Sequence, residues 1–159
     1  MKKFELTSEF ITNIFGTKLF RIKALIEFGN VKAGELGGFV EKEENLNHEG
    51  NAWVYGNAEV YGNARVYGNA SVYGDARVCG DARVYGNADY ATVHGFGSEY
   101  RTTTFFKTKA GEIGVRCGCF YGNLSEFRKK VVETHGETKK AKEYLMLADL
   151  MEFRFSDNS

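Results

Sequence analysis

The chain has 159 residues, enough for one domain or for a small repeat domain with an extra piece at each end. Its 21 basic and 21 acidic residues balance, so no net field draws it to nucleic acid or to an anionic membrane, and we expect neither as a partner. Nineteen glycines and no proline indicate regular turns made by Gly and Asn. We see no signal peptide, membrane span or disulfide framework, which favours a cytoplasmic protein.

The first forty residues are predicted to be rich in β-structure. Between Phe20 and Ala24 apolar residues alternate with Arg21 and Lys23, as in a strand with one buried face. Gly29-Asn30 is a turn signal. We expect this segment to cap the open end of the repeat that follows it.

A six-residue repeat runs from Asn51 to Tyr90. Within each repeat, Ala and Val lie two positions apart, so both side chains point to the same face of an extended strand. A Gly followed by Asn or Asp makes the corner, because these residues adopt positive φ at low cost. The successive hexads are NAWVYG, NAEVYG, NARVYG, NASVYG, DARVCG, DARVYG and NADYAT. Because one coil cannot bury its apolar face alone, stacked coils of a parallel β-helix are predicted.

These hexads resemble the hexapeptide-repeat proteins, in which a small residue follows an aliphatic one by four places, as Ala58 follows Val54. The resemblance implies three hexads per triangular coil of a left-handed β-helix, whereas the usual rule for parallel crossovers predicts a right-handed one. Residues eighteen apart then stack, with the tyrosines facing outward. Arg65 stacks on Arg83, which is unfavourable unless a partner intervenes. Val40 and Leu46 indicate a further coil whose register breaks before Val54.

The C-terminal part is predicted to be a small α+β module. Residues 102–108 and 113–120 read as a hairpin around a turn at 109–112. Asn123 with Glu126 forms a capping box for a first helix that ends at Gly136, and Thr138 begins a second helix. Residues 151–155 have the composition of a last strand. The fold prediction is therefore mainly β: a β cap and β-helix over 1–97, and the module over 98–159.

A closer resemblance covers nearly the whole chain. The run from Val31 to Ala58 is similar to the opening of a hexapeptide-repeat family of bacteria and phages, whose members are labelled putative acyltransferase or polymer-forming protein. The segment TTTFFKTKAGEIGVRCGCFYGNLSEFRKKVVETHG resembles a module attached to such repeats in bacteria and phages of Gram-positive type. This setting implies a compact, phage-encoded member in the host-cell cytoplasm, with an accessory or anti-defence role.

The segment that joins the repeat to the module gathers Gly, Ser, Thr and Arg. Such residues build nests for anions and phosphates, and basic side chains on the neighbouring strands extend the lining. The alternative is a polar linker with ordinary hairpin threonines. The candidate ligand-binding residues are Ser98, Arg101, Thr103, Lys107 and Arg116.

The resemblance also raises acyl transfer from acetyl-CoA, with His48 or His94 as the general base. The uninterrupted repeats extrude no loop to hold such a base near a substrate, so a structural or surface role is favoured for both. Cys117-Gly-Cys119 is half of a zinc motif without a second half, and no metal site is predicted. Both thiols are expected in the core, and Cys79 is expected to be a partly exposed, inert thiol.

The leading hypothesis is a non-enzymatic oligomer, most simply a homotrimer joined through its β-helix. The module of each subunit would bind a ligand, such as a nucleotide or another phosphorylated small molecule, or a host protein, without any cofactor. An acyl-CoA-dependent acyltransferase is the first alternative. A purely structural, polymer-forming protein is the second.

Overall fold

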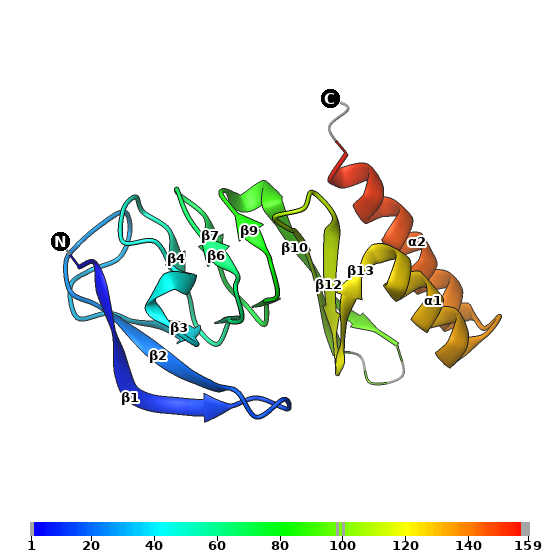
Figure 1. Ribbon diagram of the computed structural model, residues 1–159, viewed down its shortest axis with the longest axis horizontal. Coiled ribbons are helices and arrows are strands. Elements are labelled where there is room, and N and C mark those ends of the chain that lie inside the picture. The colour runs from blue at the N-terminus through cyan, green and yellow to red at the C-terminus, as the bar shows by residue number, and fades with distance from the viewer. Residues whose placement is uncertain (1, 98, 100, 157–159) are drawn as a thin grey trace.

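The computed structural model describes residues 2–97, 99 and 101–156. It is mainly β, with two helices near its C-terminal end. Along the long axis in Figure 1 come a stack of short coil strands, a four-stranded sheet and the pair of helices, and the N-terminal hairpin runs along one side of the coils. Within the described residues, neither helix is long and apolar enough to cross a membrane.

The N-terminal strands lead directly into the repeat. Strands β1 (Phe4–Thr12) and β2 (Lys18–Ala24) form an antiparallel hairpin, and β2 pairs with β3 (Leu36–Val40). Strand β3 then pairs in parallel with β5 of the repeat. The hairpin and one face of the coils therefore belong to a single five-stranded sheet.

The repeat forms a solenoid in which residues eighteen apart pair in parallel, as predicted. Trp53 pairs with Ser71, and Glu59 pairs with Arg77. The Val and Ala side chains of the first six hexads fill the interior and are at most 1% exposed, whereas Ala88 of the seventh hexad is exposed. The coil strands are β4 (Trp53–Val54), β5 (Glu59–Val60), β6 (Arg65–Val66), β7 (Ser71–Val72), β8 (Arg77–Val78) and β9 (Arg83–Val84).

A further coil precedes the perfect repeats, where Val40 and Leu46 predicted one. Val40 pairs with Val60, and Leu46 forms a bridge to Val66, in both cases twenty residues apart instead of eighteen. The amide of Asn51 donates to the carbonyl of Gly68, which restores the regular spacing. The predicted break in register is therefore a two-residue insertion within one coil, and the stack continues through it.

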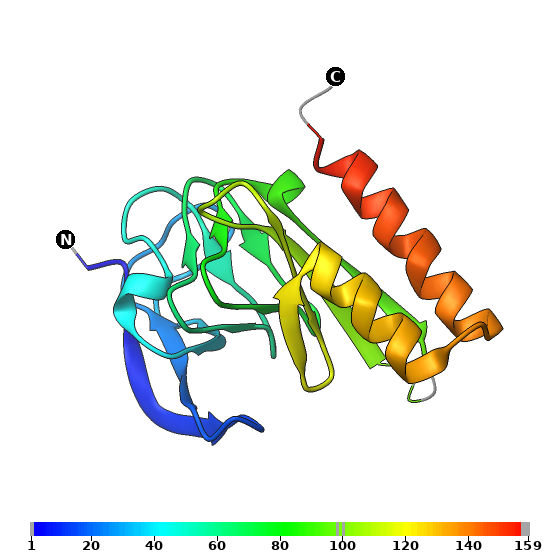
Figure 2. The ribbon, with the colours of Figure 1, turned by 45° about the vertical axis from the view of Figure 1, so that its right-hand side comes forward.

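The C-terminal sheet lies between the solenoid and the helices, as Figure 2 shows from the side. Its strands run in the order β10 (Tyr90–Phe96), β11 (Arg101–Lys107), β12 (Ile113–Cys117) and β13 (Phe120–Asn123), all antiparallel. One face contributes Tyr90 and Phe106 to the solenoid core, and the other packs with the helices. The predicted boundary at 97/98 thus falls in the turn between two strands of one sheet.

Both predicted helices form, with the predicted caps. Helix α1 (Leu124–His135) begins with the Asn123–Glu126 capping box and ends at Gly136. Helix α2 (Lys139–Arg154) begins at Thr138, whose side chain accepts a hydrogen bond from the amide of Ala141. The predicted strand at 151–155 was wrong, because Met151 continues the buried helical stripe and α2 runs on to Arg154.

The thiol predictions were also wrong for two of the three cysteines. Strand β12 ends at Cys117, and the chain turns at Gly118, so Cys119 is exposed and Cys117 is half-buried. Cys79 is buried, because the C-terminal sheet packs over that side of the solenoid. The same packing buries Tyr61, which was predicted to face outward, whereas Tyr73 and Tyr85 are 61% exposed. Tyr67 stacks on Tyr85 as predicted, with ring centroids 4.3 Å apart.

Candidate functional site

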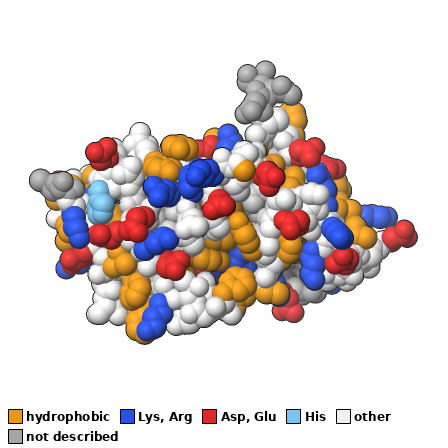
Figure 3. Space-filling view, viewed as in Figure 1, with side chains coloured by type: hydrophobic (Ala, Val, Ile, Leu, Met, Phe, Trp, Pro, Cys, Tyr) orange, Lys and Arg blue, Asp and Glu red, His pale blue; other side chains and the backbone are white. Residues whose placement is uncertain are grey.

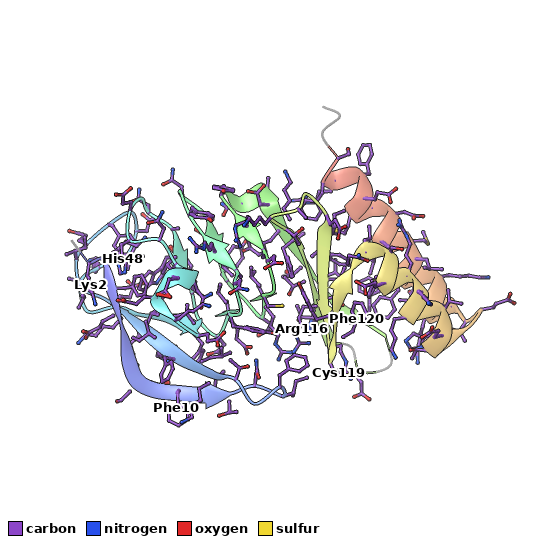
Figure 4. The ribbon with its side chains drawn as sticks, viewed as in Figure 1. Lys2, Phe10, His48, Arg116, Cys119 and Phe120 are labelled. Carbon is purple, nitrogen blue, oxygen red and sulfur yellow. The ribbon has the colours of Figure 1, made fainter. Side chains whose placement is uncertain are left out.

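The register of the C-terminal sheet divides the predicted binding residues between its two faces. Thr103 lies opposite Cys117, and Thr104 lies opposite Arg116. Directly opposite residues of an antiparallel pair share a face, and neighbours along a strand alternate. Thr103 and Cys117 therefore face the helices. Arg116 faces the solenoid, and Figure 4 shows it between the coils and the sheet. The sheet separates Arg116 from Thr103, so the two do not converge on one ligand.

A pocket of about 210 Å³ opens on the helix side, where the ends of β11, β12 and β13 meet helices α1 and α2. We call it the helix-face pocket. Aromatic and aliphatic side chains form much of its wall, and three basic side chains reach it from different elements. Its lining comprises Glu99, Arg101, Cys117, Cys119, Phe120, Phe127, Lys130, Val131, Thr134, His135 and Tyr144.

The floor of the helix-face pocket is a short polar chain. The Thr103 hydroxyl donates to Cys117 Sγ over 3.2 Å, and Cys117 Sγ lies 3.8 Å from the Tyr144 hydroxyl. Burial, followed by the neighbouring thiol of Cys117, raises the pKa of Tyr144 above its usual value. Tyr144 therefore keeps its proton at neutral pH and presents a hydroxyl group rather than a phenolate.

The basic side chains of the pocket come from both sides of it. Arg101 begins β11, and its guanidinium packs against Gly118, where a β-carbon would collide with it. Gly118 has a φ of +58°, so the backbone conformation of the turn favours glycine, and the exposed Arg101 side chain fills the space that a β-carbon would take. Lys130 and His135 project from α1, and the His135 ring stacks on Tyr144 with centroids 5.9 Å apart. The charges of Arg101 and Lys130, with the ring nitrogens of His135, suit an anionic group above an apolar wall.

Of the four predicted residues that the structure describes, Arg101 alone lines this pocket. Thr103 is fully buried beneath it, and Ser98 lies outside the described residues. Lys107 forms an ion pair with Asp89 at 3.5 Å. Arg116 is 2% exposed at the joint between solenoid and sheet.

Arg116 connects the C-terminal sheet to the solenoid. Its Nε donates to the Tyr61 hydroxyl over 2.8 Å, and its guanidinium carbon lies 5.0 Å from the ring centroid of Phe15, at the tip of the N-terminal hairpin. Its Nη1 is buried without a hydrogen-bond partner among the described residues. This side chain therefore connects three segments far apart in sequence, at the cost of a partly unsatisfied buried charge.

Neither histidine proposed as a base lies in an arrangement that favours that role. His48 Nδ1 accepts a hydrogen bond from the backbone amide of Lys3, so the basic nitrogen of the neutral ring is already occupied. His48 also stacks on Phe4 with centroids 4.4 Å apart, and burial lowers its pKa. Its place near the N-terminal end of the solenoid is seen in Figure 4. His94 is exposed on β10, and its Nδ1 lies 2.8 Å from the Thr102 hydroxyl oxygen.

Sequence reasoning missed most of the helix-face pocket, and one signal in the sequence pointed to it. Phe127, Lys130, Val131 and Thr134 follow the spacing i, i+3, i+4, i+7, so the exposed Lys130 and Thr134 lie on the same side of α1 as the buried Phe127 and Val131. Among the described residues, no cluster of three or more His, Cys, Asp or Glu could hold a metal ion.

Comparison with known families concerns the solenoid alone. Residues 58–74 and 76–88 match the family model of the YdcK beta solenoid repeat. No curated protein matches the chain. The matched segments lie within the coils and in the turn that leads to β10, so over this stretch the chain is similar to a β-solenoid repeat protein.

Proposed function

We propose that this protein is a non-enzymatic binding protein, in which the solenoid is a rigid scaffold and the C-terminal module holds a small anionic ligand. The observation that carries the proposal is the helix-face pocket. There Arg101, Lys130 and His135 surround an opening with an aromatic wall. A protonated Tyr144 and the thiol of Cys117 add polar contacts without supplying a nucleophile–base pair.

The ligand class follows from size and charge. A volume of about 210 Å³ is below that of usual drug-sized sites, so the pocket accommodates one ring and its anionic substituent rather than a whole acyl-CoA. Phe120 and Phe127 offer apolar surface to the ring, and the basic side chains offer donors to a phosphate. A nucleotide or another phosphorylated small molecule fits this combination.

The scaffold is proposed to be a homotrimer of left-handed solenoids. Tyr73 and Tyr85 each leave 61% of their surface exposed on the coils, and aromatic residues are enriched at subunit interfaces. In this arrangement the first forty residues cap the open end of the coils, and a cytoplasmic trimer presents three pockets around one axis. The left-handed sense of the coils is inferred from the resemblance to hexapeptide-repeat proteins.

Native mass spectrometry tests the proposal, with the protein alone and with mono-, di- and cyclic nucleotides and acetyl-CoA. We expect a trimer that gains one nucleotide-sized mass per subunit. Lys130→Glu should lose this mass shift, because it reverses a charge in the pocket lining. Lys129→Glu is the matched control, since Lys129 is an exposed neighbour on α1 that does not line the pocket.

Three outcomes would count against this function. No mass gain with any nucleotide would remove the proposed ligand class. Equal losses in the Lys130→Glu and Lys129→Glu variants would show nonspecific attraction to a basic helix. A mass gain with acetyl-CoA alone would favour the acyltransferase alternative.

A further inference from the structure

A second basic site lies on the solenoid itself. A groove of about 340 Å³ runs across the coils, and four separate segments of the chain supply its basic side chains. We call it the arginine-ladder groove. Figure 3 shows Lys and Arg side chains grouped over the middle of this face, with acidic side chains beside them. Its charged lining comprises Lys42, Arg65, Arg83, Lys109, Glu44 and Asp81.

The centre of the groove is a ladder of like charges. Arg65 of β6 lies directly over Arg83 of β9 in parallel register. Stacked strands are about 4.8 Å apart, so two guanidinium groups in this position repel each other. The neighbouring face of the solenoid has the opposite arrangement, since Glu59 stacks on Arg77 and the two form an ion pair at 3.7 Å. The like-charge ladder is therefore not a requirement of the repeat.

The basic side chains around the ladder are not neutralised by the protein. In the described part of the chain, none of the four forms an ion pair, although two carboxylates line the same groove. Arg83 Nη1 donates to the carbonyl oxygens of Asn63 and Ala82, at 2.7 and 2.9 Å. These bonds hold the guanidinium in place and leave Arg83 Nε and Nη2 for another acceptor.

Tertiary contacts bring the two lysines to the ladder. Lys42 Nζ lies 3.3 Å from Asn63 Oδ1, at the start of the solenoid. Lys109 lies in the turn between β11 and β12, and its amide donates to the carbonyl of Asp81 over 2.8 Å. Four basic side chains and two carboxylates, from segments far apart in the sequence, thus meet at one groove.

We propose that the arginine-ladder groove binds a di- or triphosphate group. Its lining is mostly polar, and no residue lines both this groove and the helix-face pocket. A volume of about 340 Å³ exceeds the needs of a single phosphate. Two arginines side by side match the spaced oxygens of a linked phosphate chain, because each guanidinium binds two oxygens at once. The proposal is independent of the ligand in the helix-face pocket.

Isothermal titration calorimetry with inorganic tripolyphosphate tests this site in the full-length protein. At about 50 mM salt we expect one ion bound per chain, with affinity that falls steeply at about 200 mM salt. Arg65→Ser should weaken binding about tenfold or more, as expected for the loss of one guanidinium contact. Serine already occupies the equivalent position of the next hexad, at Ser71, so the fold accepts it. Arg77→Ser is the matched control and should bind as the unchanged protein does.

Arg65→Glu separates binding from folding. This change replaces the repulsion between Arg65 and Arg83 by a Glu–Arg pair like Glu59–Arg77, so the melting temperature should rise. It also reverses a charge in the groove, so tripolyphosphate binding should be abolished. The Lys130→Glu variant should bind tripolyphosphate normally, which distinguishes this groove from the helix-face pocket. Absence of binding to the unchanged protein, or equal weakening by Arg65→Ser and Arg77→Ser, would overturn the proposal.

Discussion

At the scale of single residues, the corners of the solenoid differ in how closely the coils approach them. Gly68 has a φ of +61°, and a β-carbon added there would lie 2.6 Å from the carbonyl oxygen of Tyr85 in the next coil. Gly56 has a similar φ of +57°, but a β-carbon there would meet no atom within 4 Å. The first position requires glycine for conformation and for space, and the second for conformation alone.

We therefore expect Gly68→Ala to destabilise the protein more than Gly56→Ala. The left-handed conformation costs an alanine about 1–2 kcal/mol, and the overlap with Tyr85 adds about 1–3 kcal/mol at Gly68 only. Urea unfolding of both variants measures the difference. Equal losses of unfolding free energy would mean that the coils move apart at the corner without cost.

Lys3 is fully buried, and its ammonium group donates to the carbonyl oxygens of Ala52 and Gly50 at 2.7 and 3.3 Å. Burial lowers its pKa from 10.5 to about 8. At a pH between about 8 and 10.5, the Lys3 side chain is protonated in the unfolded chain but not in the folded chain. Deprotonation therefore costs less in the folded state, and the contribution of Lys3 makes the unfolding free energy rise with pH. Below about pH 8 both states are protonated, and the contribution of Lys3 no longer changes with pH.

Comparison of the unchanged protein with Lys3→Met isolates this effect from other titrations. From pH 8 to 10, the unfolding free energy of the unchanged protein should rise relative to that of the variant, as measured by urea unfolding at each pH. Methionine keeps the length of the side chain and has no proton to lose. Parallel pH profiles of the two proteins would contradict the lowered pKa of Lys3.

At the scale of elements, one side chain bonds to the backbone of both the first and the second coil. Asn45, in the short 3₁₀ turn η1 (Glu43–Asn45), is fully buried. Its Oδ1 accepts hydrogen bonds from the amides of Glu41 and Lys42, and its Nδ2 donates to the carbonyls of Gly62 and Ala64. One amide group thus satisfies backbone groups of two coils where the insertion interrupts the regular ladder.

Asn45→Ala should cost about 2–4 kcal/mol of unfolding free energy, because it leaves several buried backbone groups without partners. Asn47→Ala serves as the control, since the Asn47 side chain only accepts a bond from the nearby amide of Glu49. It should cost under about 1 kcal/mol. Similar losses in chemical denaturation would indicate that water replaces the Asn45 contacts.

At the scale of the whole molecule, the solenoid and the C-terminal sheet share one core. Phe106 of β11 packs in the same hydrophobic cluster as the coil valines. The amide of Arg77 donates to the Thr104 hydroxyl over 3.0 Å, and the buried Arg116–Tyr61 bond crosses the same joint. Parts connected in this way are expected to unfold together.

Two probes at opposite ends of the molecule can test this cooperativity. Trp53, the only tryptophan, is fully buried in the solenoid, while helices α1 and α2 lie at the far end. Tryptophan fluorescence and circular dichroism at about 222 nm should therefore give coincident urea transitions, as two-state unfolding requires. Loss of the helical signal at a lower urea concentration would indicate that the C-terminal module unfolds alone.

The sequence by itself determined the features that depend on neighbours along the chain. The six hexads from Asn51 to Gly86 repeat the same local choice of strand and corner, so each strand of the stack repeats the previous one and the eighteen-residue stacking follows. The caps of α1 and α2 use side chains within three residues of the backbone groups that they satisfy, and the sequence predicted them correctly.

The tertiary structure alone decided which side chains meet. The register of β11 with β12 placed Arg116 on the solenoid face and left Arg101 on the helix side, which no local pattern specified. Docking of the sheet buried Cys79 and Tyr61, and it brought Lys109 to the arginine ladder. These contacts join segments far apart in sequence, and their geometry depends on how whole elements pack, which the local preferences of each segment do not contain.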